Sequence, residues 1–127
     1  MMDDNLRHLP RLGIAGAMRL YGMTARALRF YEERGLIEAR RDRQNARFYD
    51  PAARRRLEWI SRLRRAGVGL PEIEAVLEAE VESEARALAA ETLTARRAKL
   101  AAEMAALDEV IIDLDRPETP RRLAVRG

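Results

Sequence analysis

The long run of residues from 82 to 116 limits the fold of this chain more than any other feature, because it contains neither glycine nor proline. It is rich in alanine, glutamate, leucine and arginine, all of which favour helix. We therefore predict one continuous helix. At about 1.5 Å per residue, the part from 84 to 114 would be roughly 45 Å long. A chain of 127 residues has only a modest core of its own, so we expect this helix to need a partner.

Leucines recur every seven residues along this run, and other apolar residues fill the complementary positions, which is the repeat of a coiled coil. The six apolar residues of this seam are Leu93, Leu100, Met104, Leu107, Ile111 and Leu114. Arg97 interrupts the seam, where it would fix the register or pair across the interface. We predict that residues 81–115 form a dimerisation helix and that the protein is a homodimer. The alternative is a helix that folds back on its own domain.

Residues 22–37 have the pattern of a turn followed by a helix. Gly22 can adopt the positive φ that ends a helix, and Thr24 is a good N-cap for a new helix that begins at Ala25. Gly35 would end that helix. Apolar residues recur at helical spacing from 14 to 21, so a short first helix precedes the turn.

The helix that follows this turn has an apolar side and a basic side. The predicted apolar side consists of Ala27, Leu28, Phe30 and Tyr31. Arg26, Arg29 and Glu33 point elsewhere. Two arginines in the first turns of a helix, behind a glycine-containing turn and a short helix, are typical of the recognition helix of a helix-turn-helix.

A small hairpin is predicted after this helix. Residues 38–45 are strongly polar, and Arg47 is followed by two aromatic strand formers, Phe48 and Tyr49. Asn45 lies near the expected tip, where left-handed backbone geometry is often required. The wing carries Arg40, Arg41, Arg43 and Arg47. A basic hairpin of this kind could contact the phosphate backbone or the minor groove of DNA. The alternative is an ordinary surface hairpin.

Positive charge is concentrated between residues 40 and 65, where ten arginines accompany three acidic residues. This excess of positive charge favours binding to a polyanion. The alternative is a solvated helix face without a partner.

Within the same segment, Asp50 and Pro51 predict the start of a third helix. Its buried stripe would be Leu57, Ile60 and Leu63, and Gly67 would close it. A shorter helix opens at Pro71, and Trp59 is expected to pack at a helix junction rather than to stack on a base.

Residues 1–12 and 116–127 lack a periodic apolar pattern and are predicted to be flexible tails.

Cysteine is absent and His8 is the sole histidine, so we expect no metal, no cofactor and no disulfide. No apolar run is long enough to span a bilayer, and we expect a cytoplasmic protein without membrane association. The same residue inventory leaves little for nucleophilic or general base chemistry, which argues against an enzyme.

Three separated segments resemble the MerR family of bacterial transcription regulators. Residues 27–37, A-L-R-F-Y-E-E-R-G-L-I, are similar to the family pattern T-L-R-Y-Y-E-x-x-G-L-L. Arg41, Arg47 and Tyr49 match the R-x(5)-R-x-Y pattern of the wing. Residues 63–73, L-R-R-A-G-V-G-L-P-E-I, match L-R-x-L-G-F-S-L-x-E-I. The resemblance extends over roughly residues 14–114.

The resemblance implies a mainly α fold, in which a winged helix-turn-helix domain at residues 13–80 precedes an antiparallel coiled-coil dimer. It implies that homodimers bind pseudo-palindromic promoter elements in double-stranded DNA, with the recognition helix in the major groove and the wing beside it. Tyr31 would reach a phosphate. The DNA-binding residues expected by position are Thr24, Arg26, Arg29, Tyr31, Arg41 and Arg47. We also expect Arg43 of the basic wing to bind DNA. Many members distort the promoter so that RNA polymerase can use it.

Two other functions are compatible with the same residues. One is an architectural or accessory DNA-binding protein, excisionase-like or nucleoid-associated, that bends DNA without regulating polymerase directly. The other is a helical adaptor that binds a protein through its coiled coil. The sequence specifies neither an operator, nor the sign of regulation, nor an effector ligand.

Overall fold

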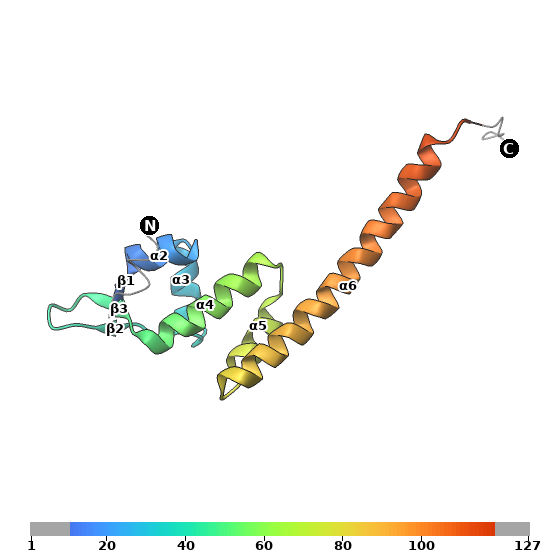
Figure 1. The fold of residues 1–127 in the computed structure, drawn as a ribbon. Coiled ribbons are helices and arrows are strands. Elements are labelled where there is room, and N and C mark those ends of the chain that lie inside the picture. The colour runs from blue at the N-terminus through green and yellow to red at the C-terminus, as the bar shows by residue number, and fades with distance from the viewer. Residues whose placement is uncertain (1–10, 119–127) are drawn as a thin grey trace. The chain divides into compact units, whose positions relative to one another are not determined.

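A computed structural model of the protein describes residues 11–118 (Figure 1). The chain divides into two compact units, one ending at Leu93 and the other beginning at Thr94. The first unit has three short strands and four complete helices: β1 (Leu12–Gly13), α2 (Ile14–Tyr21), α3 (Ala25–Glu33), β2 (Arg40–Arg41), β3 (Arg47–Tyr49), α4 (Pro51–Arg65) and α5 (Leu70–Leu77). Helix α6 (Glu82–Asp115) begins in the first unit and continues into the second. The predicted mainly helical fold with a small hairpin is confirmed.

Glycines end the helices where the sequence predicted. Gly22 has a φ of 63° and follows α2, and its backbone N–H donates to the carbonyl of Met18. Gly35 and Gly67, with φ values of 76° and 78°, follow α3 and α4. An L-residue with a side chain is strained in this conformation. The turns between the helices of the first unit are therefore encoded locally.

The sheet has the strand order β1-β3-β2, and both pairings are antiparallel. Leu12 of β1 lies opposite Tyr49 and is fully buried. The prediction that residues 1–12 form a flexible tail is therefore wrong for Leu12, which belongs to the core. Two residues are too few to give the alternating pattern that identifies a strand. His8 and the rest of that range up to Pro10 lie outside the described residues.

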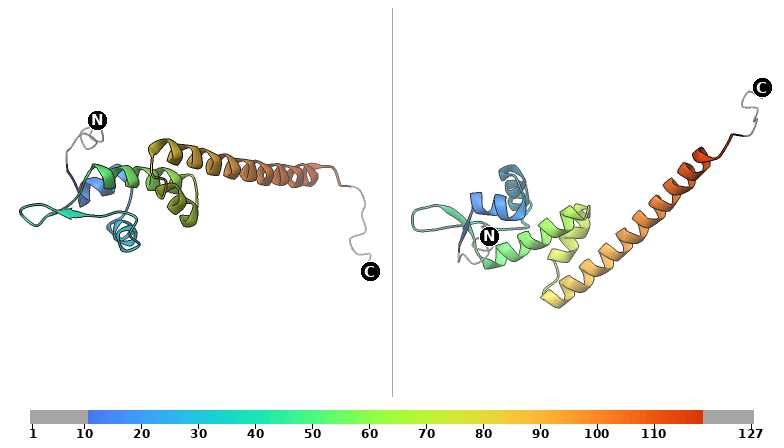
Figure 2. Two further views of the ribbon diagram at one scale, coloured as in Figure 1. Left: turned by 90° about the horizontal axis from the view of Figure 1, so that it is seen from below. Right: turned by 45° about the horizontal axis from the view of Figure 1, so that its top comes forward.

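The turn between β2 and β3 is organised by Asp42. Its Oδ1 accepts hydrogen bonds from the backbone N–H groups of Gln44 and Ala46, each at 2.9 Å. Asn45 has a φ of 66°, so the predicted left-handed residue at the hairpin tip is confirmed. The hairpin extends away from the helices of its unit in both views of Figure 2.

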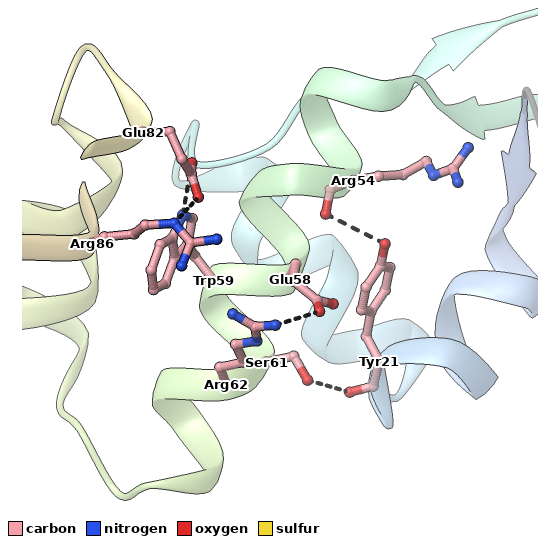
Figure 3. A network of polar contacts seen from close by, with 8 residues as sticks. All are labelled: Tyr21, Arg54, Glu58, Trp59, Ser61, Arg62, Glu82 and Arg86. Atoms are coloured by element: carbon pink, nitrogen blue, oxygen red, sulfur yellow. Dashed lines mark hydrogen bonds and ion pairs between the residues drawn. The ribbon is translucent and has the colours of Figure 1, made fainter. Parts of the chain in front are cut away.

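Helix α4 lies at the centre of the first unit, because it packs against α2, α5 and β3. Its predicted stripe of Leu57, Ile60 and Leu63 is fully buried. Ser61, which is also buried, donates to the Tyr21 carbonyl at 3.1 Å and so satisfies its hydroxyl in the core (Figure 3). The Tyr21 hydroxyl donates in turn to the carbonyl of Arg54 at 3.3 Å, which ties α2 to α4 a second time.

The first turns of α6 pack on the core of the first unit. Ala85 and Ala89 are buried there, and Leu88 and Leu93 are partly buried against the same core. The predicted boundary between residues 80 and 81 therefore does not separate two packing units, because these small alanines bring the start of α6 close to the domain. Leu93, which was predicted to lie in the dimer seam, contributes to this contact.

Asp50 caps α4 and binds the hairpin. Its Oδ1 accepts from the Ala53 N–H at 2.9 Å, and its Oδ2 accepts from Arg40 Nε at 2.7 Å. The hydrogen bond from the Ala53 amide, followed by that from Arg40, lowers the pKa of Asp50. A pKa that is lower in the folded state makes the carboxylate stabilising above its unfolded pKa of about 3.9, and this contribution is lost as the pH falls through the folded pKa.

We therefore expect Asp50→Ala to lower the free energy of unfolding by about 1 kcal/mol at neutral pH, as loss of an N-cap does. The difference from the natural protein should shrink below about pH 4. Urea denaturation at pH 7 and at pH 3 measures it. Asp50→Asn is the matched control, because it keeps an N-cap oxygen that cannot titrate. A difference between Asp50→Ala and the natural protein that is the same at both pH values would contradict the role of the ionised carboxylate.

Candidate nucleic-acid interface

Helix α3 begins at the residue predicted from its cap. Thr24 is extended, with φ −82° and ψ 161°, and its Oγ1 accepts a hydrogen bond from the Ala27 N–H at 3.0 Å. On the inner side of the helix, Leu28 is buried in the core. Thr24 itself is exposed, so the cap and the start of α3 both lie at the surface.

Two arginines occupy the outward side of α3. Arg26 and Arg29 are both exposed, and neither makes a hydrogen bond or ion pair with any residue in the described part of the chain. They are three positions apart in the sequence, so their side chains are neighbours on the helix surface. An arginine without an intramolecular partner keeps its five N–H donors for a ligand. This side of α3 therefore presents two available guanidinium groups.

Only one of the two aromatic residues of α3 lies on the predicted apolar side. Tyr31 is 6% exposed and belongs to the core, as the apolar pattern predicted, so the side chain that the resemblance led us to expect at a phosphate is largely buried. Phe30, which was expected on the apolar side, is 43% exposed. Its ring meets that of Tyr31 edge to face at 5.4 Å. Phe30 follows Arg26 by four residues, which places both on one side of the helix. The exposed aromatic ring beside the arginines is therefore that of Phe30, which has no hydroxyl to donate to a phosphate.

Glu32 connects α3 to the hairpin, and the sequence alone did not predict this role. Its Oε2 accepts a hydrogen bond from the Tyr49 hydroxyl at 2.5 Å, and its Oε1 forms an ion pair with Arg47. Burial, and then the hydrogen bond to Glu32, raises the pKa of the Tyr49 hydroxyl. Tyr49 therefore remains a donor at neutral pH. No local pattern indicates this network, because its members are 15 and 17 residues apart.

The arginines of the hairpin differ in what they contact. Arg47 pairs with Glu32, so its guanidinium is not fully available for a phosphate. Arg41 is exposed and donates from Nη1 to the Asn45 carbonyl at 2.9 Å, across the turn. Arg43 is exposed and has no partner within residues 11–118. Arg40 pairs with Asp50, so Arg43 is the one of the four wing arginines whose charge is unengaged within residues 11–118.

The C-terminal end of α3 is held by α5. Arg34 donates from Nε and Nη2 to Oε2 of Glu74, at 3.1 Å and 2.9 Å. The same guanidinium lies over the Phe30 ring, 5.7 Å from its centroid. Together with the Glu32 network, this contact fixes α3 at the hairpin and at α5.

The predicted dimerisation residues beyond Leu93 lie in the second unit and are exposed in the single chain. They are Leu100, Met104, Leu107, Ile111 and Leu114. Val110 and Ile112 are also exposed, and neither belongs to the heptad seam. Val110 lies beside the seam residues Leu107 and Leu114 on the helix surface, whereas Ile112 does not.

Among residues 11–118, no three or more histidine, cysteine, aspartate or glutamate side chains are grouped so that they could hold a metal ion. No helix in the same range is both long and apolar enough to cross a membrane.

Comparison with known proteins places this geometry in a family. Residues 13–80 match the family model described as MerR HTH family regulatory protein. The chain belongs to the MerR family. Residues 54–116 match a second model, described as MerR, DNA binding. The family assignment made from the three sequence segments is therefore confirmed, and with it a DNA-binding transcriptional regulator.

Solved MerR structures have the same fold. A regulator of the MerR family from Listeria monocytogenes is 27% identical, with a TM-score of 0.61 over 82% of this chain and 83% of that one. The HTH-type transcriptional regulator SkgA from Caulobacter crescentus is 30% identical, with a TM-score of 0.61 over 91% and 85%. HiNmlR, a MerR family regulator lacking the sensor domain and bound to promoter DNA, is 23% identical, with a TM-score of 0.54 over 77% and 79%. No curated protein matches the chain.

Proposed function

We propose that this MerR-family regulator binds a pseudo-palindromic promoter element as a homodimer and regulates transcription by distorting the DNA. The observation that carries the proposal is the outward side of α3, where Arg26 and Arg29 are exposed and unpaired within residues 11–118. A recognition helix reads base edges in the major groove, and arginine is the commonest partner of guanine there. The two arginines are therefore the main candidates for base contacts.

Arg43, the unengaged arginine of the wing, supports a contact between the wing and DNA beside the recognition helix. Phosphate contacts set the position and register of a protein on DNA without reading its sequence. Arg43 is exposed near the tip of the hairpin that extends from the domain (Figure 2). Because Glu32 binds both Arg47 and Tyr49, α3 and the hairpin are linked. We infer that the two elements engage DNA together.

The exposed strip on α6 supports a homodimer. Leu107 is 62% exposed in the single chain, and Leu114 more so. A contiguous row of apolar side chains on a helix marks an interaction surface, and the seven-residue spacing is that of a coiled coil. Two copies joined in this way would present two α3 helices, one to each half-site. Half-sites on one face of DNA and one helical turn apart have centres about 34–36 Å apart.

Charge along α6 supports antiparallel pairing. Residues 96–99 contain Arg96, Arg97 and Lys99, whereas the acidic residues of the later part are Glu103, Asp108, Glu109, Asp113 and Asp115. No basic residue lies in the last turn of the helix, where the macrodipole would favour one. In an antiparallel pair, the basic segment of one copy approaches the acidic segment of the other. A parallel pair would instead bring Arg97 against its own copy.

Distortion of the promoter would be the regulatory step. Smooth bending of a site of 20–30 base pairs costs on the order of 1–6 kcal/mol, which contacts along the bend offset. RNA polymerase is then the partner that responds to the altered promoter. Support for this step comes from membership of the MerR family and from the two candidate DNA-binding elements that Glu32 joins in each copy.

Footprinting on the DNA upstream of the protein's own gene, followed by transcription in vitro from the protected promoter, tests the proposal. We expect protection of two related half-sites, hypersensitive positions between them, and a change in transcript level. Protection with unchanged transcription would favour an architectural or accessory DNA-binding protein. No retention of any genomic fragment would favour the adaptor.

A salt titration tests the wing. We expect Arg43→Gln to reduce the slope of log affinity against log salt by about 0.9, as removal of one phosphate contact does, and to weaken specific and non-specific DNA equally. Fluorescence anisotropy at several salt concentrations measures both. Arg65→Gln is the matched control, because Arg65 is an exposed arginine of the last turn of α4, away from the hairpin. Equal slopes for Arg43→Gln and the natural protein would remove Arg43 from the interface.

A further inference from the structure

A cavity of about 300 Å³ lies in the first unit between α4, α5 and the first turns of α6. Its walls are mainly apolar and include Val76, Ala79, Val81 and Ala85. Trp59 of α4 lines the same space. Its ring lies beside the first turn of α6, as Figure 3 shows. None of the contacts proposed for DNA uses these residues.

Two of the charged groups that line the cavity are already engaged. Arg56 donates from Nε to the Leu36 carbonyl and from Nη1 to the Leu77 carbonyl at 3.1 Å. Glu82 accepts from Trp59 Nε1 at 3.4 Å, and its other oxygen lies 3.6 Å from Arg86 Nε (Figure 3). Both groups therefore serve the packing of α4 against α5 and α6.

Two other charged groups of the wall remain available. Arg55 and Glu80 are exposed, and within residues 11–118 neither has a hydrogen-bond or ion-pair partner. A guanidinium binds a carboxylate through two parallel hydrogen bonds. The carboxylate of Glu80 repels a second negative charge on a ligand. The charge pattern thus favours a ligand with a single carboxylate.

The volume sets the size of the ligand. An apolar protein cavity of about 150 Å³ accepts benzene, so a cavity about twice as large accommodates two fused rings. Small-molecule sites in general begin at about 300 Å³, are lined by apolar and aromatic side chains, and contain a few polar groups that fix orientation. An aromatic ring in the wall favours a flat aromatic ligand through stacking.

From these features we infer that the cavity binds a bicyclic aromatic monocarboxylate, with the rings against Trp59 and the carboxylate on Arg55. The site joins α4, which follows the wing strand β3, to the base of the helix proposed to form the dimer. A ligand there would bind within the DNA-binding unit itself. Its binding is independent of DNA, so it is tested without DNA.

The experiment uses the full chain and 2-naphthoate as the probe. Trp59 is the only tryptophan, so its indole N–H gives a single cross-peak in a ¹H–¹⁵N spectrum, and calorimetry gives the affinity. We expect 2-naphthoate to shift this cross-peak in a saturable manner. The uncharged 2-naphthalenemethanol should bind about tenfold more weakly, because it lacks a charge-assisted hydrogen bond. The cation 2-naphthylmethylamine should bind no better than the uncharged compound.

Two variants distinguish the proposed contact from non-specific binding. Arg55→Gln should weaken 2-naphthoate about tenfold and leave 2-naphthalenemethanol unchanged. Arg64→Gln, which alters an exposed arginine on the same helix that does not line the cavity, should bind both compounds as the natural protein does. An indole cross-peak that no probe moves, tighter binding of the cation, or equal effects of the two variants would overturn the inference. A separate gel shift on promoter DNA tells whether the proposed function itself fails.

Discussion

Leu107→Glu should convert the protein to a monomer and reduce its affinity for a two-half-site operator by about 100-fold or more, because the two half-sites are no longer bound by one linked molecule. The side chain is 62% exposed in the single chain and lies in the heptad seam of α6. In a dimer it would be buried against apolar partners, and a carboxylate buried there without a counter-charge is strongly destabilising. Sedimentation at micromolar concentration measures the mass, and a gel shift on paired and single half-sites measures the DNA affinity.

Ile112→Glu is the matched control for this experiment. Ile112 is 59% exposed, which is nearly the same as Leu107, and it lies on the same helix but outside the heptad seam. In a monomer, a glutamate at either position would therefore be solvated to a similar extent. The two variants differ in dimerisation only if the interface is formed by the seam. We expect Ile112→Glu to remain dimeric and to bind the operator normally. A dimeric Leu107→Glu would show that the interface lies elsewhere.

The positions at which helices begin and end in the first unit were predicted from single residues, because the signals for them are local. Thr24 and Asp50 each accept a hydrogen bond from the backbone N–H three residues later. Gly22 and Gly67 have the positive φ that follows a helix. These features depend on the chain within one turn, so no knowledge of the tertiary structure is needed to find them.

The interactions that fix the candidate site could not be predicted in the same way. Glu32 binds Arg47 and Tyr49 across the space between a helix and a strand, and nothing in the local sequence indicates their pairing. The exposure of Phe30, which was predicted on the apolar side, has a different cause. Both positions are apolar, and the phase of the helix around Leu28 decides which one faces the core. The helical period places Tyr31, three positions after Leu28, on the core side, whereas the phosphate contact of Tyr31 was expected from the resemblance alone.

Arg29→Ala should weaken binding to the operator by about 1–3 kcal/mol and relax the preference for the base pair that it contacts. The guanidinium is exposed and has no partner within the part of the chain that the structure describes. Removing it therefore breaks no intramolecular contact, and the stability of the fold should not change. Competition binding against operators with each half-site position substituted in turn measures the preference, and thermal unfolding verifies the fold.

The pattern of affinity changes across operator sequences decides whether Arg29 contacts a base or a phosphate. If Arg29 contacts a base, Arg29→Ala should be insensitive to one operator substitution that weakens the natural protein, and it should bind non-specific DNA almost as before. A phosphate contact would instead make the variant bind every sequence more weakly and reduce the salt slope by about 0.9. Arg65→Ala, which removes an exposed arginine of α4, is the control for the change in net charge. If Arg29→Ala and Arg65→Ala bind the operator equally well, Arg29 does not read DNA, and the proposed function loses one of the two arginines that carry it.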